Sequence, residues 1–330
     1  MILRELPCFR GFRCLAGTCP DTCCAGWAID LDPETLARYA ALPGTLGAEI
    51  REAICREDGY TFFGLRQGRC PFLNGDNLCR LILEQGEEML SVTCREHPRF
   101  WADFGDLREV SLAISCPEAA RLLLGEPVTV TSRIIEETAP EDPELDGALL
   151  ALLEGFRERL MARCQTDGPL RDRMEAVLTL GRHEDGLLLR WGAGEDVADI
   201  PEPEPAPWKL DLPGFFRVLG EMDCTDRRLP WRLARCRPRE WKPDALAVPE
   251  GRLMAYFLYR YTLRAVWDGW LWEKVAFSVY AAAAIGCLAE TFRGEPEARL
   301  RQAAVLFSRE VEHSEDNLRM LFRFLRPLCE

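Results

Sequence analysis

Residues 14–27 of the chain read CLAGTCPDTCCAGW, and this stretch places four thiols, those of Cys14, Cys19, Cys23 and Cys24, within eleven residues. Cysteine is among the most buried residue types, so packing alone accounts for an isolated one. Packing does not readily account for four so close together beside turn-forming glycines and a proline. The stretch therefore predicts a cysteine-ligated metal module.

The rest of the N-terminal third supplies further thiols. Ten of the fifteen cysteines lie within residues 1–116, about twice what an even spread would place there. Three more motifs stand out: CPFLNGDNLC at residues 70–79, CREHP at 94–98 and SCP at 115–117. The predicted metal ligands are Cys14, Cys19, Cys23, Cys24, Cys70, Cys79, Cys94 and Cys116.

The spacing of these thiols bears on the metal. Thiolates are soft ligands for zinc, copper(I) or iron–sulfur clusters. A disulfide framework is not expected, because the chain is large and has an odd number of cysteines. Zinc knuckles favour a Cys-x2-Cys pair, which is absent here, whereas looser spacings occur around iron–sulfur clusters. A [4Fe–4S] cluster is the first choice and zinc the alternative.

Two details of the motifs leave alternatives open. Neighbouring side chains point in different directions, so Cys23 and Cys24 do not easily face one ion. Either one of them is a packing thiol or there are two metal sites. His97 is either a ligand or a helix-end residue before Pro98, and we favour the second.

Length and pattern predict the architecture. A chain of 330 residues suits about two domains. We expect a cysteine-rich metal module at residues 1–125 and a mainly helical domain at 126–330, with a proline-rich linker near 194–209. The fold class expected is mainly α, that is α+β with minor β.

Apolar periodicity locates the elements. We expect helices over residues 149–161, from residue 174 onward and over 300–325, the last restarting at Ser314 or Asp316 as N-caps. Charged residues of this last segment, such as Glu310 and Glu312, fall outside its apolar stripe. A helical pair at 252–289 breaks near Asp268. Strands are expected at 110–115 and 128–131.

Composition limits the partners. A formal net charge of −13 argues against nucleic-acid binding, which normally needs a basic surface. The first residues lack the apolar core of a secretory signal, and no apolar run reaches the roughly 18 residues of a spanning helix. Residues 275–288 are expected to form a buried helix. We expect a soluble cytoplasmic protein without membrane insertion, whose acidity suits a cationic partner or only confers solubility.

Together these motifs resemble the flagellin lysine-N-methylase family. The resemblance covers residues 14–30 and 70–80, GEEMLSVTCREHPR at 86–99 and SCPEAAR at 115–121, and more weakly Tyr256-Phe257, Asp268-Gly269 and FSREVEH at 307–313. The cysteine-rich part also resembles a broader group of small zinc- or iron-chelating proteins. The family implies transfer of a methyl group from S-adenosylmethionine to side-chain nitrogens of flagellin lysines.

Such a transfer needs a neutral amine, whereas a free lysine has a pKa of about 10.4. An apolar cleft lowers that pKa by desolvation, and a carboxylate then accepts the proton. Residues beside the motifs suit both tasks: Trp27, Phe100 and Trp101 as walls, and Asp21, Glu87 or Glu88 as acceptors. The sequence has neither a Rossmann glycine-rich turn nor the Cys-x3-Cys-x2-Cys run of radical S-adenosylmethionine enzymes.

Two other functions fit the same cysteines. One is a metal-chelating adaptor without its own catalysis. The other is a redox sensor that uses exposed thiols.

Overall fold

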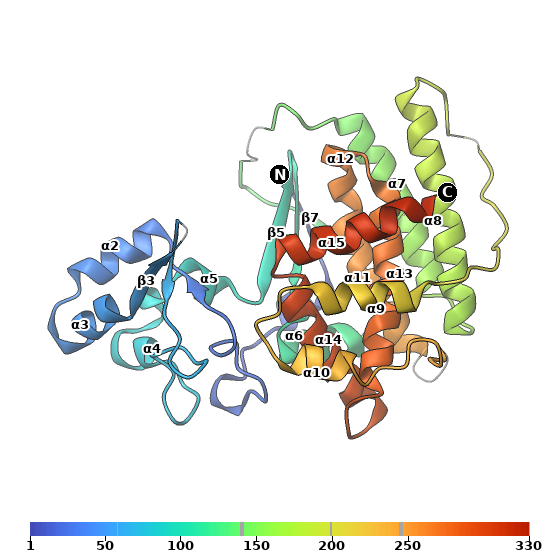
Figure 1. The fold of residues 1–330 in the computed structure, drawn as a ribbon. Coiled ribbons are helices and arrows are strands. Elements are labelled where there is room, and N and C mark those ends of the chain that lie inside the picture. Colours follow the sequence, from blue (N-terminus) through green and yellow to red (C-terminus); the bar gives the residue numbers. More distant parts are fainter. Residues whose placement is uncertain (58, 139–141, 199, 244–246, 330) are drawn as a thin grey trace.

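The computed structural model describes residues 1–330 except 58, 139–141, 199, 244–246 and 330. It is 55% helical with 11% strand, which confirms the mainly α class with minor β. Figure 1 shows a small lobe, formed by residues 29–94, beside a larger helical body. Residues 14–27, called the cysteine segment below, run between the two.

The small lobe has its own hydrophobic core. An antiparallel sheet of order β2-β4-β3 packs with short helices, and ten buried apolar residues, from Ile29 to Met89, fill the interior. Helix α2 begins where Asp32 accepts a hydrogen bond from the Thr35 amide and Pro33 occupies the first turn. The elements are β2 Ile29–Asp30, α2 Pro33–Ala41, α3 Gly44–Ala53, β3 Ile54–Glu57, β4 Tyr60–Phe63, α4 Arg80–Gln85, η2 Glu87–Met89 and α5 Val92–Glu96.

A four-stranded sheet of order β5-β6-β1-β7 lies against the helical body. Strands β1 and β6 are parallel, and the other pairs are antiparallel. The strands are β1 Ile2–Glu5, β5 Arg99–Phe104, β6 Leu107–Leu112 and β7 Thr131–Ile134, and the nearby helices are α1 Pro7–Gly11, η1 Ala16–Thr18 and α6 Pro117–Gly125.

Both predicted strands were misplaced along the chain. The strand expected at 110–115 ends at Leu112, because the chain then turns toward α6, which has Pro117 in its first turn. The strand expected at 128–131 begins only at Thr131. The amide of Val128 is bonded to the side chain of Gln165 at 2.7 Å, not to a neighbouring strand.

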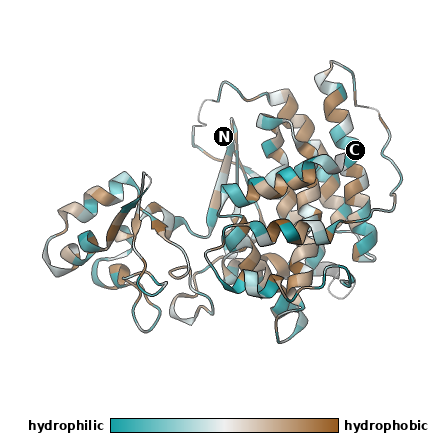
Figure 2. Cartoon of the chain, viewed as in Figure 1, coloured by the Kyte–Doolittle hydropathy of each residue, from teal (hydrophilic) through white to brown (hydrophobic). Residues whose placement is uncertain are grey.

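The helical body surrounds helix α13, all of whose residues are buried. In Figure 2 hydrophobic residues gather on the inner helices of this body. The helices are α7 Gly147–Cys164, α8 Leu170–Gly192, α9 Leu212–Glu221, α10 Arg228–Leu233, α11 Ala247–Tyr261, η3 Thr262–Arg264, α12 Ala265–Asp268, α13 Leu271–Ala289, α14 Pro296–Val311, α15 Glu315–Leu325 and η4 Arg326–Cys329.

Most helix predictions are confirmed. The pair at 252–289 breaks where Gly269 adopts a φ of +71°, a left-handed conformation that glycine accommodates without strain. The segment at 300–325 is two helices, and Ser314 caps the second by accepting from the Asn317 amide. Asp316 is not a cap but lies in the first turn.

Within the described residues, one helix, Leu271–Ala289, is long and apolar enough to cross a membrane, yet it is entirely inside the fold. This burial is that of a core helix, as expected for residues 275–288.

The two hydrophobic cores separate residues 29–94 from the rest of the chain. Residues 6–12 and 104–128 contribute to the same core as the helices. Residues 200–211, which contain the proline run, form no helix or strand between α8 and α9. The domain boundary at residue 125 and the linker near 194–209 concern independent folding and stay predictions.

Candidate metal centre and its junction with the helical body

Four of the eight predicted ligands lie together at the small lobe. The amide of Cys70 donates to the carbonyl of Cys24 at 2.8 Å, which joins the cysteine segment to the 70–79 loop. Cys70, Cys79 and Cys94 all pack against the small-lobe core. Burial first, and then the charges of neighbouring thiols, raise the pKa of Cys70 to about 11 and that of Cys94 to about 12. Cys24, Cys70, Cys79 and Cys94 are called the lobe thiols.

Three other predicted ligands lie toward the helical body. Cys116 precedes α6 and packs against the large core, not the small one. Its pKa is raised by burial and, more weakly, by the charges of Cys19 and Cys14. Cys14, Cys19 and Cys116 are called the junction thiols.

Cys23 stands between the two groups and is hydrogen-bonded to Cys24. This bond lowers the pKa of Cys24 and raises the pKa of Cys23. Cys24 therefore ionises more readily than Cys23, and the thiolate is the form that binds metals and reacts with oxidants.

The thiols provide suitable donors without a preformed site. The fourteen cysteines with described side chains are free. In the described part of the chain, no group of three or more His, Cys, Asp or Glu side chains is placed so that it could hold a metal ion. The ligand set and the choice between [4Fe–4S] and zinc stay predictions.

Three rings meet where the cysteine segment approaches the helical body. Trp27 lies edge-on to His97 and to His313, with ring centroids 5.4 and 4.7 Å apart. The Nε2 atom of His313 lies 2.7 Å from the hydroxyl of Ser115, beside Cys116. Residues 27, 97, 115 and 313, which are far apart in the sequence, thus lie close together. The place where they meet is called the junction.

The two histidines have low proton affinity. Burial lowers the pKa of His97 to about 4, and burial together with the charge of His97 lowers that of His313 to about 3, although part of His313 is exposed. His97 ends α5, so its predicted helix-end position is confirmed.

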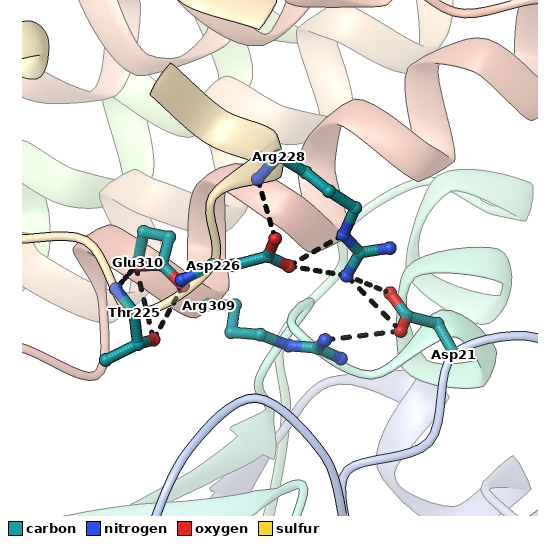
Figure 3. A network of polar contacts seen from close by, with 6 residues as sticks. All are labelled: Asp21, Thr225, Asp226, Arg228, Arg309 and Glu310. Atoms are coloured by element: carbon teal, nitrogen blue, oxygen red, sulfur yellow. Dashed lines mark hydrogen bonds and ion pairs between the residues drawn. The ribbon is translucent and has the colours of Figure 1, made fainter. Parts of the chain in front are cut away.

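Beside the rings, Asp21 of the cysteine segment faces two arginines of the helical body (Figure 3). Its carboxylate lies 3.2 Å from Arg228 and 3.3 Å from Arg309. Arg309 is almost fully buried, with its side chain 5% exposed. The predicted proton acceptor Asp21 is therefore engaged in ion pairs.

A buried carboxylate, that of Glu312, lies at the C-terminal end of α14, the helix that carries Arg309. Glu312 has no exposed side-chain surface and lies 2.9 Å from Arg260. It also accepts hydrogen bonds from Tyr261 at 2.9 Å and Tyr256 at 3.1 Å. The Arg260 guanidinium lies 3.7 Å from the ring centre of Phe100, which connects this network to strand β5.

The other predicted site residues do not lie together. Trp101 follows Phe100 on the strand, is 48% exposed, and lines a groove of about 690 Å³ with Arg108 and Arg133. Glu87 and Glu88 are exposed on η2 of the small lobe. Of the three predicted aromatic walls, Trp27 lies at the junction and Phe100 contacts Arg260, the partner of Glu312. The third, Trp101, belongs to neither group.

Sequence reasoning missed the partners supplied by the helical body. Arg260, and the contacts of Arg309 and Glu312, carry no local motif that marks a site. The available signal was the resemblance of FSREVEH at 307–313 and of Tyr256-Phe257 to family segments.

No family model and no solved structure matches the chain. Among curated proteins, the lysine-N-methylases of Salmonella typhimurium and Salmonella choleraesuis are each 32% identical over 123 residues, covering 35% of this chain and 31% of theirs. The flagellar biosynthetic protein FliU of Salmonella muenchen is 32% identical over 123 residues, again 35% of this chain but 73% of its own length. The chain thus matches about a third of the length of the named methylases.

Proposed function

The chain belongs to the family of the flagellar biosynthetic protein FliU, and we propose that it is an S-adenosylmethionine-dependent methyltransferase acting on lysines of flagellin. In this reaction the neutral lysine nitrogen attacks the methyl carbon. The carbon–sulfur bond breaks, S-adenosylhomocysteine leaves, and the methylated ammonium releases a proton.

The observation that carries the proposal is the convergence of distant segments at the junction. Segments that resemble the methylase family meet there, although Trp27 is 70 residues from His97 and 286 residues from His313, which follows α14. A site assembled from a whole chain suits an enzyme better than a simple chelator, which would not need the helical body.

The junction also supplies chemistry that fits an amine substrate. Trp27 offers an aromatic wall that desolvates an amine and lowers its pKa. His97 and His313 stay neutral because burial lowers their pKa values, so they place no positive charge beside an amine substrate. Transfer of the released proton to water completes the proposed step.

A metal or [4Fe–4S] cluster at the cysteines is part of the proposal. The ligands would come from the lobe thiols and the junction thiols, with Cys23 as a bridging candidate. The small lobe supports this idea, because ten buried apolar residues among those described form its core, and a core in a domain of fewer than about 70–80 residues rarely supplies more than about 3–5 kcal/mol of stability. We assign the metal the role of stabilising the lobe and route no step of the transfer through it.

The test is methylation of purified flagellin by the anaerobically reconstituted protein with S-adenosylmethionine. We expect the intact mass of flagellin to rise by multiples of one methyl group. A Trp27→Ala variant that keeps its metal content should transfer methyl groups more slowly. Unmodified flagellin, in an assay where a known methylase works, would overturn the proposal.

One observation favours a second function, redox sensing. The low pKa of Cys24, hydrogen-bonded to Cys23, is typical of an oxidisable thiol. A sensor or chelating adaptor would bind metal or undergo reversible oxidation without binding S-adenosylmethionine. Calorimetric titration with S-adenosylmethionine therefore separates these functions from the methyltransferase.

A further inference from the structure

The small lobe is joined to the helical body through few contacts. Among the residues that the structure describes, its helices and strands pack extensively only with one another. The chain connects lobe and body on either side of residues 29–94, and the ring contacts of Trp27 and His97 with His313 lie at this connection. Any side chain that anchors the cysteine segment to the body therefore has a large effect on the position of the lobe.

Asp21 is such an anchor. It lies between Cys19 and Cys23 and meets Arg228 at the start of α10 and Arg309 near the end of α14. These two helices belong to the helical body, so one carboxylate connects the cysteine segment to two of its elements.

The receiving arginines are themselves held in place (Figure 3). Arg228 is bonded to Asp226 at 2.7 Å, and the amide of Asp226 donates to Glu310 at 3.2 Å. Glu310 also accepts from the amide of Thr225 at 2.8 Å and follows Arg309 directly. The contacts form a closed ring from α14 through residues 225–228 and back through Asp21.

Charge makes Asp21 important to this ring. Arg309 is buried, and removing the partner of a buried charge costs far more than removing an exposed ion pair. Within the described residues, the ion-pair partner of Arg309 is Asp21. Without Asp21, the arginine either stays buried without this counter-charge or moves toward water, and both outcomes weaken the docked arrangement.

We propose that Asp21 is a positioning residue that docks the cysteine segment, and with it the small lobe, on helices α10 and α14. Undocking moves the lobe and its thiols away from the junction while both hydrophobic cores remain folded. That this docking serves methyl transfer rests on the proposed function; the docking itself does not.

Hydrogen–deuterium exchange of the metal-free full chain tests the docking. In Asp21→Asn we expect amides of residues 14–27 and 92–98 to exchange about 5- to 30-fold faster, the factor that corresponds to a loss of one or two kcal/mol. Amides of α2 and α13 should keep their wild-type rates, because they report the two cores. Asp21→Glu should restore most of the protection.

Asp316→Asn is the matched control, since Asp316 is 86% exposed and pairs with Arg319 on the surface. It should leave exchange at 14–27 and 92–98 unchanged. Arg309→Gln should reproduce the effect of Asp21→Asn, and the double variant should add little to either. Wild-type rates at 14–27 in Asp21→Asn, or equally faster exchange in α2, would overturn the proposal. No methyl donor is present, so the result is independent of the proposed reaction.

Discussion

Replacement of Arg260 by methionine removes the counter-charge of a carboxylate that has no exposed surface. Arg260 itself is 9% exposed and lies 2.9 Å from Glu312. Methionine fills much of the same space, so the main change is the loss of charge and of the hydrogen bonds. Tyr256 and Tyr261 still donate to the carboxylate, but neither neutralises it.

The magnitude follows from this burial. Breaking a buried ion pair by removing one partner costs about 3–5 kcal/mol, and the two tyrosine bonds place the expected value near the lower end. Glu312→Gln keeps an acceptor for the tyrosines and should cost about 1.5–3 kcal/mol, the range for hydrogen bonds to charged groups. The double variant should cost less than the sum of both by about 1 kcal/mol or more, because neither charge is then left alone.

Urea unfolding followed by far-ultraviolet circular dichroism measures these differences, because the network belongs to the predominant helical body. Arg319→Met is the control: Arg319 is 53% exposed and its ion pair with Asp316 should be worth about 1 kcal/mol or less. A cost below about 1 kcal/mol for Arg260→Met, or strict additivity in the double variant, would refute the view that this pair holds α11 and α14 together.

Three further predictions concern other parts of the fold. Burial raises the pKa of Glu184 to about 7 despite its bond to Arg159. As pH rises, Glu184 therefore ionises in the unfolded chain before it ionises in the folded one. The free energy of unfolding should fall between about pH 4.5 and 7, by at most about 3 kcal/mol. Urea titrations at about pH 5 and pH 8 should show this loss in wild type and not in Glu184→Gln. Gly181→Ala would place a methyl group 2.4 Å from Val275 and should destabilise the α8–α13 contact by about 1–3 kcal/mol. The control is Gly186→Ala on the same helix, whose methyl group would meet nothing within 4 Å. This control should be neutral or stabilising in the same unfolding assay. Chelation of metal from the reconstituted protein should speed hydrogen exchange in residues 29–94 and leave α13 protected; equal protection with and without metal would contradict a stabilising metal.

The helices could be predicted because the patterns that specify them involve residues close together in the sequence. The stripe of Leu300, Phe307, Leu318 and Leu325 has the period of a helix, and each of these side chains is buried. Ser314 interrupts the pattern as a cap, and the structure ends one helix and begins another there. Period and capping depend on neighbours in sequence, so they could be read without knowledge of the fold.

The strands could not be placed in the same way. Strand β1, Ile2–Glu5, gains its partners from residues 107–110 and 131–134, more than a hundred positions away. Short strands carry too few residues for an alternating pattern to exceed chance, and pairing decides their ends. Val128 illustrates this, since its amide is bonded to a side chain where a strand partner was expected.

The end of α14 shows why the junction was only partly predictable. Glu310 and Glu312 fall outside the apolar stripe, and charged residues in such positions normally face water. Here Glu310 is 3% exposed because Thr225 and Asp226 donate to it, and the Glu312 side chain is buried because Arg260 and two tyrosines surround it. The partners come from other helices, so helical periodicity cannot report them. With Arg309 bound to Asp21 and His313 to Ser115, the end of α14 contacts residues of the cysteine segment, the sheet region, α11 and the segment before α10. An isolated helix would have no reason to carry so many buried polar groups. Here Glu310 and Glu312 bind partners within the helical body, whereas Arg309 and His313 connect this helix end to Asp21 and Ser115.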